Sequence, residues 1–461
     1  MSPEQSDDPR VPEPAMTPMP PKESADDPSA AAVRPVPESQ RIFALDVLRG
    51  FALLGIFMVN MQFFAQPFMH AVADPAVADA PLADKASWFF VKAFCEYKFI
   101  SMFSLLFGIG MIVQTMRVQA KGRSFAPYYL RRTGILALFG LAHALLLWYG
   151  DILFIYACIS LVLFLMRGLS ARTLIIVAVW LVAGSLFLST TCASLQVWTL
   201  QVQAEQAAAA PEQPEEPATG VEADPPRGWA AVMAAGFDPS QEAWARGERL
   251  AYREGPFGDV VAFRSVTYGF ALIAGVFSYG WHVLVMFILG AALMKLDFFA
   301  PGRRAWHRKF LLIGGLVGVP LECLSASIFV WSGFDPGWML LAVNVLHEVG
   351  AYSLCLAYVG GMTLLANSGA ARWLMTAMAS IGRTALSNYI LQTVAATFLM
   401  YWWGLAWFDE VSRPEMIGIV LVIYAGQLVT SRIWLSVFSI GPLEWLWRSL
   451  TYLRPQPMLR R

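Results

Sequence analysis

The chain has 461 residues, of which 57% are hydrophobic and 14% are charged, and its formal net charge at pH 7 is zero. Soluble domains have about a quarter of their residues charged, whereas here the apolar residues form long continuous blocks. The composition therefore predicts an integral membrane protein with the lipid bilayer as a partner. A neutral chain without a groove-reading motif is not predicted to bind nucleic acid.

Apolar blocks and tails predict the organisation of the chain. Residues 1–40 are rich in Pro, Ser, Asp and Glu, which predicts a disordered cytoplasmic tail and not a signal peptide. A membrane helix needs about 20 apolar residues, and this criterion predicts an all-α polytopic transmembrane helix bundle of about ten spans. The predicted spans are 43–66, 94–116, 130–149, 151–167, 173–196, 267–294, 310–332, 338–366, 381–403 and 415–437.

Basic residues gather in alternate connections of this ten-span arrangement and at its C-terminal end. Because cytoplasmic loops are enriched in Lys and Arg, both termini are predicted on the cytoplasmic side of a bacterial inner membrane. The predicted units are a five-span half at 41–196, an external polar insertion at 197–266, a second five-span half at 267–437, and a cytoplasmic surface helix and tail at 438–461. The insertion is either a flexible loop or, from Trp229 to Phe263, a set of helices that cap the external mouth or lie on the membrane surface.

The first predicted span contains an acid and a base three residues apart, Asp46 and Arg49, and an amide further along, Asn60. An isolated charge in lipid costs several kcal/mol, so such groups face protein, water or each other. Asp46 and Arg49 are therefore candidates for a functional site. The alternative is an ion pair at the end of the helix, near the headgroups, and the sequence leaves both open.

Further polar side chains inside the spans fall at two depths: Arg383, Asn388 and Gln392 near the cytoplasmic ends, and His143, Asp151, His347 and Glu348 in the outer half. One hypothesis is a polar path in which Arg49 and Arg383 hold an anionic group and a histidine accepts a proton. The alternative is hydrogen bonding that only holds the helices together. His143 and Asp151 flank one helical hairpin and favour function, whereas single Asn and Gln residues favour a structural role.

The chain has five cysteines without paired spacing, no phosphate-binding glycine loop and no cluster of metal ligands in its sequence. The sequence therefore predicts neither a metal site nor a tightly bound cofactor, and it argues against an ATP-driven pump. It does not determine the oligomeric state, so a homo-oligomer stays open.

Five ordered segments resemble the YeiB-like bacterial membrane proteins, whose C-terminal half is the domain of unknown function 418. The segments are RIFALDVLRGFALLGIFMVN at Arg41–Asn60, KFISMFSLLFGIG at Lys98–Gly110, RRTGILALFGLAHALLLWYGDILFIYA at Arg131–Ala157, IGRTALSNYILQT at Ile381–Thr393 and GPLEWLWRSLTY at Gly441–Tyr452. The resemblance covers nearly the whole chain from residue 41 onward, except much of the insertion.

The LDVLRG and VN pattern of the first segment is also similar to the opening of transmembrane acyltransferases of the heparan-α-glucosaminide N-acetyltransferase type. This similarity carries over Asp46, Arg49, Gly50 and Asn60, and it implies transfer of an acyl group from cytoplasmic acyl-CoA. In those enzymes a catalytic histidine follows the Val-Asn pair, and the nearest candidate in this chain is His70. The residues before His70 differ, because QFFAQPFM stands in place of their Gly-rich turn.

On this hypothesis acyl-CoA is a co-substrate whose phosphates bind Arg49 or Arg383. His143 beside Asp151 is the preferred base, ahead of His70 and His347, and Asn60 orients the acceptor or polarises the thioester. The acceptor is an envelope glycan, a lipid or a small molecule. A transporter of a small anionic or amphipathic solute and a non-catalytic membrane scaffold are the alternatives.

Overall fold

The computed structural model describes residues 41–72, 75–122, 124–209, 225–275, 279–335 and 337–460. Helices make up most of these ranges, and the β-structure within them is one isolated bridge between Phe438 and Leu459. The prediction of an all-α bundle is therefore confirmed. The predicted disordered tail at 1–40 and the part of the predicted insertion at 210–224 lie outside the described residues.

The helices follow one another with short connections. In the first part of the chain they are α1 (Phe43–Ala65), α2 (Phe68–Val72), η2 (Pro75–Ala78), α3 (Leu82–Phe90), η3 (Val91–Cys95), α4 (Lys98–Ala120), α5 (Ala126–Leu146), α6 (Leu153–Met166) and α7 (Ala171–Ala209). The later helices are α8 (Gly228–Ala234), α9 (Glu242–Glu254), α10 (Phe257–Ala274), α11 (Gly280–Lys295), α12 (Arg304–Trp331), α13 (Met339–Ser368), α14 (Arg372–Arg383), α15 (Ala385–Met400), α16 (Arg413–Val437) and α17 (Pro442–Tyr452).

Each of the ten predicted spans coincides with one helix or with two consecutive helices. Within the described ranges, six stretches are long and apolar enough to cross a membrane: α1, α3 to α4 together, α7 as far as Thr199, α12, α13 and α16. The helices α6, α11 and α15 are apolar but shorter. The chain is therefore a helical membrane protein, and the total of ten spans and their orientation stay predictions.

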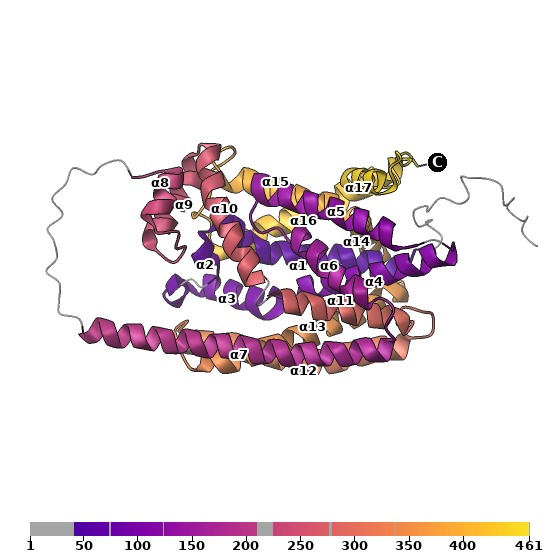
Figure 1. Ribbon diagram of the computed structural model, residues 1–461, viewed down its shortest axis with the longest axis horizontal. Helices are drawn as coiled ribbons and strands as arrows, with labels where there is room; N and C mark the ends of the chain where they lie inside the picture. The colour runs from indigo at the N-terminus through magenta and orange to yellow at the C-terminus, as the bar shows by residue number, and fades with distance from the viewer. Residues whose placement is uncertain are drawn as a thin grey trace, which may run out of the picture.

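Figure 1 shows an elongated bundle whose long helices run side by side. The helices α2, α8 and α9 and the start of α10 gather at one end, which we call the cap end. The opposite end, which we call the basic end, holds α17 and the C-terminus. The later part of the insertion, expected from its apolar spacing to be helical, does form helices that pack on one another.

The helix α1 lies in the middle of the bundle and contacts α4, α13, α14, α15 and α16. Its closest crossing, with α14, depends on two glycines. A Cβ atom on Gly50 would lie 2.0 Å from the carbonyl oxygen of Met378, and one on Gly382 would lie 1.9 Å from that of Asp46. Because a side chain at either position would overlap backbone, only glycine allows this contact. The crossing places the neighbouring residues Arg49 and Arg383 at the same end of the bundle.

Candidate active site

A cavity of about 520 Å³ lies at the basic end, between α1, α4, α5, α15 and α17. Arginines from five separate segments line it: Arg41, Arg49, Arg117, Arg132, Arg383 and Arg448. The acidic side chains in its wall are Asp46 and Glu444. The predicted candidates Asp46, Arg49 and Arg383 are thus brought together here, in the wall of one cavity.

Both acids of the cavity wall already have partners. Asp46 forms an ion pair with Arg49 at 2.8 Å between Oδ1 and Nη1, and a longer one with Arg41 at 3.7 Å. Glu444 accepts hydrogen bonds from the backbone N–H groups of Leu386 and Ser387, at 2.6 and 3.1 Å, and so caps the first turn of α15. Because the wall contains more arginines than acids, its net charge is positive.

Two ionisable groups on α17 have pKa values that burial shifts. Burial, together with repulsion from Arg41 and Arg132, lowers the pKa of Arg448 to about 10. Burial also raises the pKa of Glu444, despite its hydrogen bonds to Ser387. An additional anion among these arginines would relieve the repulsion, and guanidinium groups bind phosphate and carboxylate oxygens in bidentate pairs. The rim of the cavity therefore suits an anionic group.

The interior of the cavity is mostly apolar and aromatic. Its wall includes Leu53, Phe103, Phe107 and Tyr156, and it also includes Ile152, Leu153 and Tyr389. A charged rim with an apolar interior is the arrangement that a molecule with an anionic head and an apolar or extended remainder would fill.

Next to the cavity lies a buried pair formed by His143, near the end of α5, and Asp151, just before α6. His143 Nδ1 is 2.9 Å from Asp151 Oδ2, and the two residues are 2% and 4% exposed. The other carboxylate oxygen of Asp151 accepts the N–H of Phe154 at 2.9 Å. The fold thus brings His143 and Asp151 into direct contact.

The partners of His143 assign different roles to its two nitrogens. Because a carboxylate accepts hydrogen bonds, Nδ1 donates to Asp151, and in the neutral imidazole Nε2 is the acceptor. Nε2 lies 2.9 Å from Thr393 Oγ1 on α15, and the Thr393 hydroxyl also donates to the carbonyl of Tyr389 at 3.4 Å. A histidine that a carboxylate orients through one nitrogen, with a lone pair on the other, has the geometry of a general base.

Tyr389 separates the cavity from this pair. Its ring centroid is 5.1 Å from that of His143, and its hydroxyl donates to the carbonyl of Gly150 at 3.3 Å. Tyr389 lines the cavity and lies one turn before Thr393 on α15, while Ile152 lines it next to Asp151. From Ala385 near the arginine rim to Thr393 the helix rises about 12 Å.

Two predicted candidates on α15 face away from the cavity wall and bond to α16. Asn388 Nδ2 donates to Ser431 Oγ at 2.9 Å, and Gln392 Nε2 donates to Gln427 Oε1 at 2.9 Å. Gln427 in turn donates to the backbone carbonyl of Asn388. These contacts correspond to the structural alternative, in which amides hold neighbouring helices together.

The two candidates taken from the acyltransferase similarity, Asn60 and His70, are not among the residues that line the cavity. Asn60 lies in the C-terminal half of α1, and His70 is half-buried on α2 at the cap end. Of the histidines proposed as a base, His143 is the one next to the cavity.

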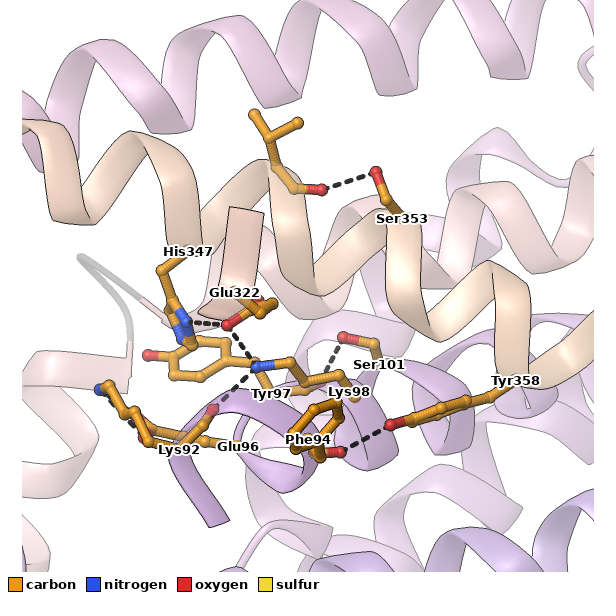
Figure 2. A network of polar contacts seen from close by, with 11 residues as sticks. Lys92, Phe94, Glu96, Tyr97, Lys98, Ser101, Glu322, His347, Ser353 and Tyr358 are labelled. Carbon is orange, nitrogen blue, oxygen red and sulfur yellow. Dashed lines mark hydrogen bonds and ion pairs between the residues drawn. The ribbon is translucent and has the colours of Figure 1, made fainter. Parts of the chain in front are cut away.

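His347 and Glu348 belong to a separate buried network, part of which Figure 2 shows. Lys98 Nζ and Glu322 Oε2 are 2.7 Å apart with side chains fully buried, and His347 Nδ1 lies 3.0 Å from the same carboxylate oxygen. Glu348 Oε1 lies 3.2 Å from His282 Nδ1. These residues do not line the cavity, so the structure divides the predicted polar path into two sites.

Tyr97 links the two parts of this network, because its ring contacts both His282 and His347 with centroids 5.1 Å apart in each case. Sequence reasoning missed the ion pair of Lys98 and Glu322. The signal was present, since each is an ionisable residue in or next to an apolar helix. The cavity arginines at 117, 132 and 448 belong to basic groups that the sequence assigned to cytoplasmic connections and to the surface helix, where Lys and Arg are expected. In the structure they lie in α4, α5 and α17.

The chain is also similar in sequence to known proteins. Residues 293–454 match the family model described as "Protein of unknown function (DUF418)". The relatives include "Uncharacterized protein YxaH" of Bacillus subtilis (strain 168), 32% identical over 94% of this chain and 99% of the relative. "Uncharacterized protein YeiB" of Escherichia coli (strain K12) is 28% identical over 92% of this chain and 99% of its own length. No solved structure matches the chain.

Proposed function

The chain belongs to the YeiB-like family of bacterial membrane proteins that contain the DUF418 domain, and we propose that it is an acyltransferase that uses acyl-CoA as donor. The acceptor is an envelope glycan, a lipid or a small molecule on the other side of the membrane. The observation that supports this proposal is the arginine-lined cavity whose apolar wall ends at Tyr389, beside His143 and Asp151.

The cavity matches the chemistry of the donor. The phosphates of CoA pair with the arginine rim, and the pantetheine arm and acyl group lie along the apolar wall. An extended pantetheine arm spans the distance of about 12 Å along α15. Since acyl-CoA is made in the cytoplasm, the proposal requires the basic end to face the cytoplasm in the inner membrane, as the distribution of Lys and Arg predicts.

The reaction follows from the hydrogen bonds of His143. Its Nε2 takes the proton of the acceptor hydroxyl or amine, whose oxygen or nitrogen attacks the thioester carbonyl carbon. The C–S bond then breaks, and the CoA thiolate takes the proton back from His143. Asp151 stabilises the intermediate imidazolium through Nδ1. The Thr393 hydroxyl occupies the place at Nε2 that the acceptor would take.

The experiment is a thermal-shift titration of the detergent-purified full chain with acetyl-CoA and longer acyl-CoAs. At ten times its dissociation constant, a ligand that binds only the folded state stabilises it by about 1.4 kcal/mol. We expect a shift for the unchanged chain and its loss in Arg49→Ala and Arg132→Ala. The matched control is Arg304→Ala, because Arg304 is exposed and outside the cavity wall.

The absence of a shift with every acyl-CoA, from a protein that still melts cooperatively, would contradict acyl-CoA as the donor. The same cavity would then favour the alternative function, binding and transport of another amphipathic anion. A shift that persists in both cavity variants would contradict the arginine rim as the phosphate site.

A further inference from the structure

A groove of about 410 Å³ lies between α12 and α13, and we call it the α12 groove. Its wall is one face of α12, from Trp306 to Val317, together with Ser353 and Leu356 of α13. Most of these side chains are apolar, and Ile313 and Val317 are exposed. Because α12 and α13 are both long and apolar enough to cross a membrane, an exposed apolar face on them lies against the hydrocarbon of the bilayer.

Small residues form the floor of the α12 groove. A Cβ atom on Gly314 would lie 2.4 Å from the carbonyl oxygen of Ser353, so glycine allows the two helices to approach closely here. The larger side chains of Phe310 and Leu356 form the sides. The Ser353 hydroxyl donates to the carbonyl of Val349 in its own helix at 2.8 Å (Figure 2). Since this hydroxyl has a partner, the floor can hold an apolar chain.

The end of the α12 groove nearer the start of α12 is basic. Lys309 is exposed and has no ion pair or hydrogen bond with another described residue. One turn earlier, the guanidinium carbon of Arg303 lies 5.7 Å from the centre of the Trp306 ring. None of the described residues that line the groove is acidic. Trp, Lys and Arg at one end of an apolar surface are typical of the level of the lipid headgroups.

The length of the α12 groove corresponds to one leaflet of a bilayer. From Trp306 to Val317 the helix rises about 16 Å, and half of the hydrocarbon core of a bilayer is about 15 Å. A molecule that fills the groove thus has an apolar chain one leaflet long and an anionic head at Lys309. A zwitterionic headgroup suits this end less well, because its own cation would lie close to Lys309 and Arg303.

We propose that the α12 groove binds an anionic phospholipid, with its phosphate at Lys309 and one acyl chain along the groove as far as Val317. This site is separate from the proposed acyltransferase site, because none of its residues lines the arginine-lined cavity. A lipid in the groove contacts both helices and so stabilises their packing. The same packing holds Glu322 of α12 against His347 of α13.

The test is native mass spectrometry of the detergent-purified full chain, which gives the dissociation constant of each bound lipid. The probes are dioleoylphosphatidylglycerol, which is anionic, and dioleoylphosphatidylcholine, which has the same acyl chains and no net charge. The variant Lys309→Gln removes the cation of the groove. The matched control is Arg308→Gln, because Arg308 is exposed on the same helix and does not line the groove. A second variant, Ser353→Leu, places a larger side chain on the floor.

We expect the unchanged chain and Arg308→Gln to bind the first phosphatidylglycerol about fivefold more tightly than the first phosphatidylcholine. This preference should disappear in Lys309→Gln, and Ser353→Leu should bind phosphatidylglycerol at least fivefold more weakly while it still melts cooperatively.

Three results would overturn the lipid site. The first is the absence of a preference in the unchanged chain. The second is an equal loss of the preference in Lys309→Gln and Arg308→Gln, which would indicate attraction by the basic surface alone. The third is glycerol phosphate, a headgroup without acyl chains, binding as tightly as phosphatidylglycerol, which would indicate a phosphate site without a place for the chain.

Discussion

The proposed chemistry depends on which proton His143 carries, and Asp151 determines this. In Asp151→Asn the amide keeps the size of the side chain, but its NH₂ group can donate to Nδ1 and so favours the other tautomer, with the proton on Nε2. We expect kcat to fall about 10³- to 10⁴-fold, as for the corresponding change in a serine-protease triad, with unchanged acetyl-CoA affinity. Steady-state transfer kinetics and thermal shift measure the two quantities. A kcat within tenfold of the unchanged chain would contradict the role of His143 as base.

Glu248 should make stability depend on pH. Burial raises its pKa to about 8 in the folded chain from about 4.3 when unfolded, so the folded state binds more protons between these values. Stability contributed by the protonated carboxyl is complete below the unfolded pKa and is lost as pH rises toward 8. We expect the melting temperature of the unchanged chain, relative to Glu248→Gln, to fall between pH 5.5 and pH 8.5. Parallel melting curves over this range would show that Glu248 is not held protonated.

At the scale of elements, the crossing of α1 and α14 supports the arginine rim. In Gly382→Ala the new Cβ would overlap the carbonyl oxygen of Asp46, so the helices must separate. We expect a destabilisation of about 1–3 kcal/mol and weaker acetyl-CoA binding, measured by thermal melting with and without the ligand. In the control Gly418→Ala, on α16, the Cβ meets open space, and stability should stay equal or rise. Equal behaviour of the two variants would contradict the close crossing.

The sequence predicted the helices but not all of their breaks. Apolar runs locate helices because a membrane segment must satisfy its own backbone hydrogen bonds. The predicted span 381–403, however, begins within α14, continues beyond a break at Thr384 and includes α15. This break exposes the N–H groups of Leu386 and Ser387, which Glu444 caps. The partner lies far along the chain, so no local pattern could predict it.

The candidate site shows the same division between local and distant information. The hairpin of His143 and Asp151 was predictable because the two residues are close in sequence and costly to bury. Arg49 and Arg383 were predictable as ionisable residues in apolar segments. The contribution of Arg132 and Arg448 to the same wall depends on how α5 and α17 pack.

At the scale of the whole molecule, the arginine-lined cavity lies at the basic end of the bundle, and His143 and Asp151 lie next to it on the side toward the cap end. This order suits transfer across a membrane, with acyl-CoA on one side and the acceptor on the other. CoA esters do not cross a bilayer because of their phosphates, so the orientation of the protein determines which vesicles consume added donor.

We therefore predict that everted inner-membrane vesicles, whose cytoplasmic face is outside, release free CoA from added acetyl-CoA when they enclose the acceptor. Sealed right-side-out vesicles should do so at least tenfold more slowly until detergent opens them. A protease-sensitive tag at the C-terminus reports the orientation of the same vesicles, and it should be cleaved only in the everted ones. If right-side-out vesicles with a protected tag consumed the donor, the cavity would not open to the cytoplasmic face. Because the arginine rim and α17 lie at the same end of the bundle, that result would contradict the transfer direction and not only the assigned topology.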